Sequence, residues 1–326
     1  MRFVIYGAGG IGGVIGAQLF MAGHEVALIA RGAHLKAMQD HGMRYETPNL
    51  SEILHIPAFG HPREIDWRED DVVLLTMKSQ HTGDALEELR IIAGDEIPVI
   101  CCQNGVANER MALRVFQNVY AMLVFLPAAL LEPGLVQTHA IRKIGLLDAG
   151  LYPGGTDEMI TKVTAALDGA NFSAEPCDKV MRFKYGKLMT NLGNSLQAIA
   201  IPGEGAKEIF RQMRREALAC FAAAGIDCVT QAEEKQRRGD LMQTGEIKGS
   251  PRVAGSSWQS LQRGTGDIEA DFLNGEIVLL GRMHGVATPA NLILQRLATK
   301  IARERGAAQS MEIGEIQKLI AVQEAR

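Results

Sequence analysis

The sequence predicts an α/β protein, with a doubly wound parallel sheet in the N-terminal half and an all-α C-terminal domain. Three observations predict this architecture. Short runs rich in Val, Ile and Leu alternate with amphipathic stretches in the first half, a glycine-rich turn follows the first run, and helical periodicity dominates after about Cys177. The chain of 326 residues is long enough for two domains. We expect them to span residues 1–175 and 176–326.

The predicted strands are apolar on both faces, as expected for strands of a parallel sheet that helices cover on both sides. They are Phe3–Tyr6, Val26–Ala30, Val72–Thr76, Val99–Cys102 and Tyr120–Phe125. Helical patterns at Ile11–Ala22 and His34–Gln39 lie between some of them, which is the alternation of a doubly wound sheet. The segment from Gly134 to Asp148 predicts two further strands at the edge of this domain.

The second half contains helical patterns and no convincing strand. Its helical segments read "KVMRFKYGKLMTNLGNSLQAI", "AKEIFRQMRREALACFAAAG", "EADFLNGEIVLLGRMHG" and "ANLILQRLATKIARERG". The stretch Gln231–Gly255 is polar, charged and contains glycine, so we expect part of it to be a loop.

Composition excludes several classes of protein. The net charge of −4 gives no basic surface for nucleic acid, and no apolar run is long enough to span a membrane. The chain opens directly into a predicted strand, so we expect no signal peptide. The cysteines lack the spacing of a metal site, so we expect no metal and reduced thiols in a cytoplasmic protein. Cys101 and Cys102, neighbours in a strand, should point to opposite faces.

The turn after the first strand carries a G-x-G-x-x-G motif, formed by Gly7, Ala8, Gly9, Gly10, Ile11 and Gly12. Gly7 allows a tight turn, Gly9 lets the backbone approach a pyrophosphate, and Gly12 permits close packing of helix on strand. The pyrophosphate would lie against the N–H groups that open the helix. In this context the motif predicts a Rossmann-like dinucleotide-binding domain.

The end of the second strand indicates which dinucleotide is bound. Sites that prefer NAD usually carry Asp or Glu there, whereas this strand ends at Arg31, with no carboxylate from Leu28 to Gly32. A guanidinium suits a 2′-phosphate through charge-assisted contacts, although a solvated loop arginine is the simpler alternative. Lys78, just after the third strand, could add a second positive charge. We therefore predict NADP(H) as the cofactor.

Polar residues on one predicted helix indicate a substrate site. Lys187, Asn191 and Asn194 follow one another at i, i+4 and i+7, away from the apolar face of the helix. Asparagine is a poor helix former, so two of them in line with a lysine predict a stripe that faces a cleft. A lysine ammonium there could donate a proton to an oxygen that becomes negative during hydride addition to a carbonyl. The alternative is a solvated face with incidental asparagines.

A carboxylate partner for the lysine is expected further along the chain. If a helix begins near Asp267, Phe272, Leu273 and Leu280 mark its buried face and Glu269 falls on that face. A buried carboxylate without a partner is costly, and Lys187 is a suitable partner. Glu276 lies at i+7 on the same face, so periodicity alone does not separate the two acids.

The turn Gln103-Asn104-Gly105 follows the fourth strand, and ligands bind at this end of the strands in open α/β sheets. We therefore expect Asn104 to lie near the nicotinamide. The pair Asn-Gly is also favoured in plain turns, and both interpretations are compatible.

Taken together, these motifs resemble the ketopantoate reductase family from the glycine turn to about Leu297. They occur in the order "GAGGIG", "MKSQ", "QNG", "PGLVQTHA", "KLMTN", "EADFLNG" and "HGVATP". The resemblance implies an N-terminal Rossmann domain, a helical C-terminal domain and a cleft between them for NADPH and a 2-oxo acid. It also implies the reduction of 2-dehydropantoate to pantoate, and we expect a homodimer formed by the helical domain.

The resemblance assigns roles on the substrate side. Lys187 is similar to the catalytic lysine that protonates the carbonyl oxygen, and Glu269, rather than Glu276, to the acid that supports it. The substrate's carboxylate and hydroxyl would be held by Asn191, Asn194 and Ser257.

On the cofactor side, the resemblance places Asn104 beside the nicotinamide ribose and the substrate. Arg31 and Lys78 would contact the 2′-phosphate, and Gln80 would border the adenine pocket.

Two departures from the family pattern concern the substrate. The segment "NLGNSLQAI" is one residue shorter than usual, with Ser195 in place of a proline, so that either Asn194 or Ser195 could face the substrate. The segment "SSWQSLQ" lacks the usual aspartate and carries the bulky Trp258. A related enzyme for another 2-oxo or 2-hydroxy acid is therefore one alternative, and a non-catalytic NADP-sensing protein is another.

Overall fold

The computed structural model describes residues 1–250 and 254–325, which form two compact units. The first unit contains residues 1–103, 108–183 and 231–250, and the second contains residues 104–107, 184–230 and 254–325. This division differs from the expected boundary at residues 175 and 176. The first unit continues to residue 183, inside a helix, and also includes residues 231–250 from the second half of the chain.

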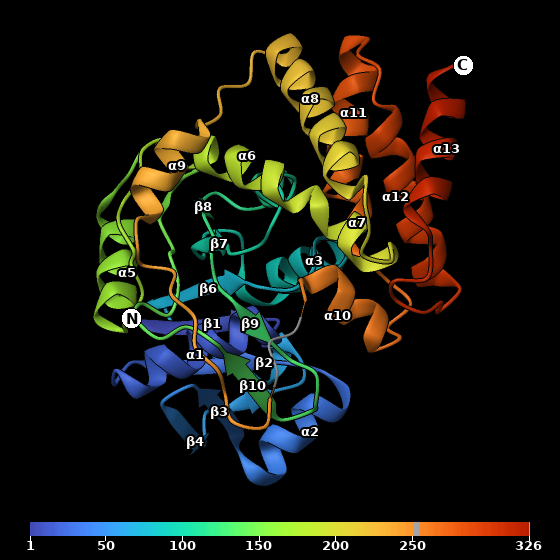
Figure 1. The fold of residues 1–326 in the computed structure, drawn as a ribbon. Helices are drawn as coiled ribbons and strands as arrows, with labels where there is room; N and C mark the ends of the chain where they lie inside the picture. The colour runs from blue at the N-terminus through green and yellow to red at the C-terminus, as the bar shows by residue number, and fades with distance from the viewer. Residues whose placement is uncertain (251–253, 326) are drawn as a thin grey trace. The chain divides into compact units, whose positions relative to one another are not determined.

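A seven-stranded sheet lies at the centre of the first unit, in the order β11-β8-β7-β6-β1-β2-β5 (Figure 1). Its strands are β1 (Arg2–Tyr6), β2 (Glu25–Ile29), β5 (Ala58–Phe59), β6 (Asp71–Leu75), β7 (Val99–Cys101), β8 (Val119–Met122) and β11 (Ala149–Leu151). Neighbouring strands are parallel except for β11, which runs antiparallel to β8. The strands expected from the sequence are confirmed, with ends that differ by at most three residues.

Helices cover both faces of this sheet, as the apolar character of its strands predicts. The helices of the unit are α1 (Gly10–Met21), α2 (Gly32–His41), α3 (Thr82–Ala93), α4 (Asn108–Leu113), α5 (Glu158–Gly169) and α9 (Gln231–Arg238), with short turns η1 (Pro62–Glu64) and η2 (Ser79–His81). One apolar core contains Phe3 with residues of α1 and α5, and the other contains Val4 with residues of α3 and α4. Cys101 and Cys102 lie in different cores, which confirms their opposite orientations.

A second, four-stranded sheet corrects one expectation. Its strands are β3 (Met43–Thr47), β4 (Leu50–Leu54), β9 (Ala128–Ala129) and β10 (Leu135–Thr138), in the order β4-β3-β10-β9. The segment from Gly134 to Asp148 therefore supplies one strand, β10, to this separate sheet, where two strands at the edge of the domain were expected. The reason is non-local, since β10 pairs in parallel with β3 from an earlier part of the chain.

The polar stretch after Gln231 folds back onto the first unit. It begins as helix α9 and continues as a loop that forms backbone hydrogen bonds with His139 and Ile141. Arg237 of α9 donates to both oxygens of Asp148, at 2.6 and 2.8 Å. Because Asp148 is buried, this bidentate pair fixes the segment to the sheet.

Helix α6 (Val180–Asn191) crosses the division between the units, and the other elements of the second unit are helical. They are α7 (Gly193–Ile199), α8 (Ala206–Ala224), α10 (Ser256–Gln262), η3 (Glu269–Asp271), α11 (Asn274–His284), α12 (Pro289–Arg303) and α13 (Ile313–Glu324). Helix α12 packs against α7, α8, α11 and α13, and α10 packs against α7. The predicted all-α domain is confirmed for the residues described.

Residues 1–250 and 254–325 lack two features, a membrane-spanning helix and a cluster of metal ligands. No helix there has both the length and the apolar character needed to cross a membrane. No group of three or more His, Cys, Asp or Glu side chains there is arranged to hold a metal ion.

Candidate active site

In the glycine turn after β1, Gly9 has room for a side chain, whereas Gly7 and Gly12 do not. Gly7 has a φ of +102°, and a Cβ there would lie 2.6 Å from the backbone nitrogen of Met77. A Cβ on Gly12 would collide with the Thr76 hydroxyl and with the Gly7 carbonyl. By contrast, a Cβ on Gly9 would meet only the Gly7 oxygen, at 3.8 Å. The backbone at Gly9 therefore leaves room for the close approach of a pyrophosphate, which would lie against the N-terminus of α1.

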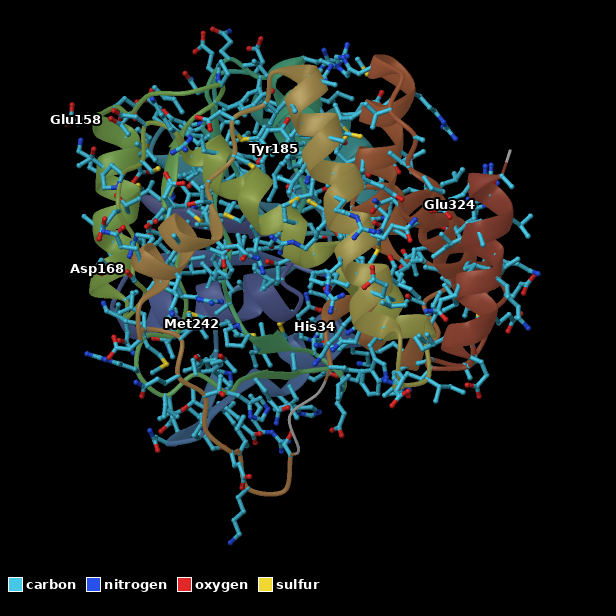
Figure 2. All side chains as sticks on the ribbon, turned by 45° about the horizontal axis from the view of Figure 1, so that its top comes forward. His34, Glu158, Asp168, Tyr185, Met242 and Glu324 are labelled. Carbon is cyan, nitrogen blue, oxygen red and sulfur yellow. The ribbon has the colours of Figure 1, made fainter. Side chains whose placement is uncertain are left out.

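The imidazole of His34, a residue labelled in Figure 2, ties this turn to a second loop of the same unit. His34 Nδ1 accepts a hydrogen bond from the Gly134 backbone N–H at 2.9 Å, so Nε2 carries the proton and donates to the Ala8 carbonyl at 2.8 Å. Burial lowers the pKa of His34, which keeps it in this neutral form. The sequence contained no signal for this contact, because Gly134 is 100 residues away.

The cofactor residues predicted from the strand ends lie at one edge of the main sheet. Arg31 follows β2 and Lys78 opens η2 after β6, and both of these strands pair with β1. The Arg31 side chain is 65 % exposed. Gln80 lies within η2, and both of its amide atoms are buried without a hydrogen-bond partner among the described residues. Such an amide suits a ligand that can both donate and accept hydrogen bonds.

A buried polar network that the sequence did not predict fixes the loop carrying Lys78 and Gln80. Gln103 Nε2 donates to the Met77 carbonyl at 3.0 Å and to Thr82 Oγ1 at 2.7 Å. Thr82 Oγ1 donates in turn to Asn108 Oδ1 at 2.9 Å, and Asn108 Nδ2 donates to Ser79 Oγ at 3.1 Å. Only the position of Gln103 at the end of a strand could have drawn attention to it. The adjacent Asn104, a predicted site residue, is half-buried and belongs to the second unit.

The predicted lysine–asparagine stripe lies on α6 and α7. The apolar face is buried as expected, since Leu188, Met189, Leu192, Leu196 and Ile199 are at most 6 % exposed. The helix is interrupted at Leu192, whose carbonyl accepts a hydrogen bond from Asn274 Nδ2 at 3.2 Å. Lys187 is half-buried. Asn191 is only 4 % exposed, and its Oδ1 has no hydrogen-bond partner among the described residues.

Ser195 and Asn194 have different surroundings, which bears on which of them is available to a ligand. Ser195 is fully buried and donates to Asn274 Oδ1 at 2.6 Å. Asn194 is half-buried, and within the described parts of the chain its side chain makes no hydrogen bond. Asn194 is therefore the residue of the two that retains its hydrogen-bonding capacity.

Ser257 lies near this stripe because α10 packs against α7. The backbone N–H of Gly255 donates to Gln197 Oε1 at 3.0 Å, and the position of a Cβ on Gly255 is 3.7 Å from Asn194 Oδ1. Ser257 is 1 % exposed, and its hydroxyl is a second buried polar group without a hydrogen-bond partner in the described structure. Trp258, next to it, is half-buried.

The two candidate acids do not share one helix, contrary to expectation. Glu269 begins the short turn η3, and α11 begins only at Asn274, not near Asp267. The chain leaves helical geometry at Leu273, which has φ −107° and ψ −81°, so the i+7 spacing does not place Glu269 and Glu276 on one face. Both carboxylates are nevertheless buried, at 8 and 9 % exposure.

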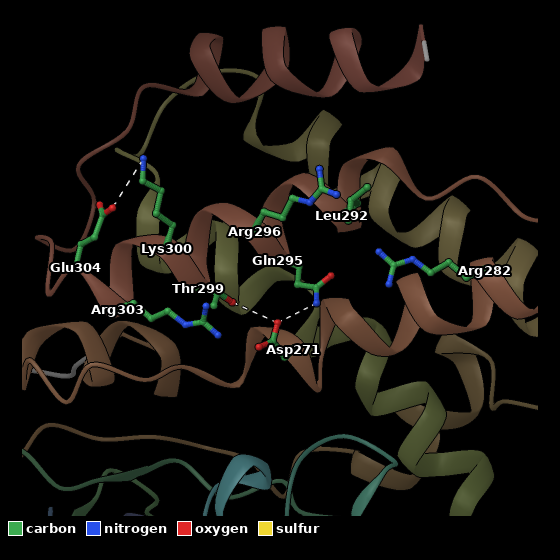
Figure 3. Close-up of a pocket in the computed structure, with 9 residues that line it drawn as sticks. All are labelled: Asp271, Arg282, Leu292, Gln295, Arg296, Thr299, Lys300, Arg303 and Glu304. Atoms are coloured by element: carbon green, nitrogen blue, oxygen red, sulfur yellow. Dashed lines mark hydrogen bonds and ion pairs between the residues drawn. The ribbon is translucent and has the colours of Figure 1, made fainter.

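A separate depression of about 390 Å³ lies on the second unit, between α11 and α12 (Figure 3). Its lining includes four basic residues, Arg282, Arg296, Lys300 and Arg303, and two acidic ones, Asp271 and Glu304. Asp271 accepts hydrogen bonds from Gln295 at 2.9 Å and from Thr299 at 3.4 Å. None of the residues predicted to bind substrate or cofactor lines it.

Comparison with known proteins identifies the family. The model "Ketopantoate reductase PanE/ApbA" matches residues 3–149, and the model of its C-terminal domain matches residues 171–302. A 2-dehydropantoate 2-reductase of Pyrococcus horikoshii is 28 % identical over 91 % of this chain and 96 % of its own length.

Two solved structures share the fold. A PanE/ApbA family ketopantoate reductase from Ralstonia eutropha has a TM-score of 0.77 and 28 % identity, covering 94 % of this chain and 99 % of that one. A D-mandelate dehydrogenase with NADH and anilino(oxo)acetate also has a TM-score of 0.77, at 21 % identity and with the same coverage. Both units are thus accounted for, and the chain belongs to the ketopantoate reductase family, as an oxidoreductase that acts on C=O and CH–OH groups with a nicotinamide cofactor.

Proposed function

We propose that this chain uses NADPH to reduce a small 2-oxo acid, most simply 2-dehydropantoate to pantoate. The observation that carries the proposal is the pair of buried polar atoms without partners, Asn191 Oδ1 and Ser257 Oγ. A buried polar atom left without a hydrogen bond costs about 1–3 kcal/mol, so a chain that keeps two of them benefits when a polar ligand satisfies them. Both atoms belong to the unit that also holds Lys187 and Glu269.

In this proposal Lys187 is the proton donor. Its ammonium stabilises the negative charge that develops on the carbonyl oxygen and transfers a proton from Nζ to that oxygen. Lys187 and Asn191 are one turn apart on α6, so both project from the same side of the helix. The role assigned to Glu269 is to keep the lysine protonated and oriented, which a carboxylate at 8 % exposure does more strongly than one in water.

The cofactor site consists of the glycine turn and the neighbouring strand ends. Gly9 and the N-terminus of α1 would hold the pyrophosphate, Arg31 and Lys78 the 2′-phosphate, and Gln80 the adenine side. NADPH, when bound, supplies the hydride that adds to the carbonyl carbon. The network of Gln103 and Asn108 keeps these loops in place before the cofactor arrives, which reduces the entropy lost on binding.

The substrate site is polar, and its proposed charged groups are Lys187 and its partner Glu269. Asn191, Asn194 and Ser257 would bind the carboxylate and hydroxyl groups of the substrate, with Asn104 contributing beside the nicotinamide. Trp258 adjoins Ser257 and is the residue most able to change the size of the pocket. The presence of Trp258 therefore favours a second candidate function, in which the enzyme acts on a different small 2-oxo or 2-hydroxy acid. The proton-donating lysine argues against a non-catalytic NADP sensor, and the homodimer and the cytoplasmic location stay predictions.

A substrate panel tests this proposal. The purified chain is mixed with NADPH and one of several 2-oxo acids, including ketopantoate, pyruvate, 2-oxoisovalerate and phenylglyoxylate, and loss of NADPH absorbance is followed. Fast turnover confined to ketopantoate is the expected result. NADPH binding with turnover only of another 2-oxo acid would support the second candidate function and exclude the first. Binding of NADPH without turnover of any 2-oxo acid would contradict both.

A further inference from the structure

Four side chains meet at the edge of the main sheet where β1, β2 and β5 end. Glu88 of α3 accepts a hydrogen bond from the Tyr6 hydroxyl at 2.7 Å, and the same oxygen lies 3.5 Å from His61 Nε2 and 4.0 Å from Arg31 Nη2. Tyr6 ends β1, and Arg31 and His61 follow β2 and β5, which neighbour one another in the sheet. A carboxylate thus stands beside the arginine proposed to hold the 2′-phosphate.

The carboxylate is fixed more firmly than the arginine. Tyr6 is only 3 % exposed, and its short hydrogen bond holds one oxygen of Glu88 in place. Burial and the Glu88 carboxylate together raise the pKa of Tyr6, so the phenol remains a hydrogen-bond donor. The distance of 4.0 Å to Arg31 exceeds a hydrogen bond, and the Arg31 side chain is 65 % exposed. Glu88 therefore does not orient the guanidinium, and acts on it mainly through charge.

His61 contributes a donor to the same oxygen. Its Nδ1 accepts a hydrogen bond from the Arg63 backbone N–H at 3.2 Å, so in the neutral ring the proton is on Nε2, which faces Glu88. The groups around Glu88 among the described residues are thus two donors and one guanidinium. Within the described parts of the chain, no second carboxylate contacts these four side chains.

From this arrangement we infer that Glu88 sets the preference between NADPH and NADH, by opposing the 2′-phosphate and accepting a hydrogen bond from a 2′-hydroxyl. A phosphate that pairs with Arg31 enters the field of the Glu88 carboxylate, and two like charges repel. A ribose 2′-hydroxyl carries no charge and gains from a nearby carboxylate, which is the usual basis of NADH recognition. The inference rests on the proposed function, since it takes Arg31 as the 2′-phosphate contact.

The test is the substitution Glu88→Gln, which removes the charge and keeps a side chain that accepts from Tyr6. Dissociation constants for NADPH and NADH are measured by fluorescence titration at low and at high salt. We expect the ratio of NADH to NADPH dissociation constants to rise about tenfold at low salt, and the increase to shrink at high salt, because exposed charges are screened. An unchanged or lowered ratio would overturn the inference. A lowered ratio would mean that Glu88 positions Arg31 instead of opposing its ligand.

Two further variants separate this inference from the proposed function. Glu87→Gln removes the neighbouring exposed carboxylate of the same helix, and should leave the ratio within about twofold of the unmodified chain. Arg31→Ala should weaken NADPH binding much more than NADH binding. If Arg31→Ala lowers both affinities equally, the proposed 2′-phosphate contact is wrong and the inference falls with it. If Arg31→Ala acts selectively and Glu88→Gln changes nothing, only the inference is wrong.

Discussion

Ser195 donates a hydrogen bond to Asn274 across 2.6 Å, and this contact joins the proposed substrate helix to a buried chain of polar groups. Asn274 Nδ2 donates to the Leu192 carbonyl and, at 3.1 Å, to Asn291 Oδ1, and Asn291 Nδ2 donates to Glu216 at 2.7 Å. Glu216 also accepts from the backbone N–H groups of Ala290 and Asn291 at the start of α12. The chain thus links α7, α11, α12 and α8 where Asn191 and Asn194 flank the helix break.

The network predicts that Asn274→Ala destabilises the protein. Its loss leaves the Ser195 hydroxyl and Asn291 Oδ1 without their Asn274 partner and removes one donor from the Leu192 carbonyl, all in a buried region, which should cost about 3 kcal/mol of the free energy of unfolding. Denaturant unfolding followed by circular dichroism measures this value. Met283→Ala, at an exposed position of the same helix, should change stability by less than about 0.5 kcal/mol. Equal stability of the two variants would show that the network does not support the fold.

Two serines provide a matched test of structural and substrate-binding roles. Ser195→Ala should destabilise the protein by about 1–2 kcal/mol, since Asn274 loses its donor. Ser257→Ala removes a hydroxyl that has no partner among the described residues, so it should leave stability unchanged or slightly raised. If that hydroxyl binds substrate, the same variant should lower kcat/KM by about ten- to a hundredfold. A loss of stability without a loss of kcat/KM for Ser257→Ala would contradict the proposed site.

Two glycines of the turn after β1 provide a second matched pair of variants, which separates cofactor binding from folding. Gly9→Ala places its methyl group in open space at a negative φ, so the protein should fold normally but bind NADPH at least about tenfold more weakly. Gly12→Ala collides with Thr76 and with the backbone of Gly7, and should lower the melting temperature as well. Thermal unfolding and nucleotide titration of both variants separate the two effects. Full NADPH affinity in Gly9→Ala would mean that the pyrophosphate does not approach this backbone.

Much of this arrangement could be predicted because it depends on local patterns. The apolar runs located five strands of the main sheet along the chain, and the strand ends placed Gly7, Arg31 and Lys78 at one edge of the sheet. The periodicity of residues 185–199 identified the buried apolar face of α6 and α7. These features follow from spacing along a single element and need no knowledge of distant contacts.

The remaining features depend on contacts between distant residues. The break at Leu273, which separates Glu269 from Glu276, precedes Asn274, whose partners come from α7 and α12. Likewise, Arg237 returns to the first unit because of Asp148, 89 residues earlier. No periodicity within one element encodes such pairings, so the sequence did not predict the second sheet or the place of residues 231–250 in the first unit.

The His34 bridge predicts a pH dependence of stability. Burial lowers the pKa of His34 below its ordinary value of 6.5, and protonation would abolish the acceptor for the Gly134 N–H. As the pH falls below about 6.5, the unfolded chain takes up a proton that the folded chain resists, so the free energy of unfolding decreases by at most about 1.4 kcal/mol per pH unit. His34→Ala should flatten this slope and weaken NADPH binding. Urea unfolding of the unmodified chain and of His34→Ala, from neutral pH to below pH 6.5, measures this pH dependence. Equal slopes for the two proteins would exclude His34 as its cause.

Replacing the proposed proton donor tests the chemistry most directly. Lys187→Ala removes the only group to which the proposal assigns proton transfer, and should lower kcat by about 10²–10⁴ while leaving NADPH affinity nearly unchanged. The matched control is Lys207→Ala, at an exposed position of α8, which should retain full activity. Partial recovery of Lys187→Ala by added primary amines would support a proton-transfer role, because a small amine can occupy the vacated space and donate in its place. Full activity of Lys187→Ala would contradict the mechanism, whereas loss of NADPH binding would show that the lysine serves the cofactor instead.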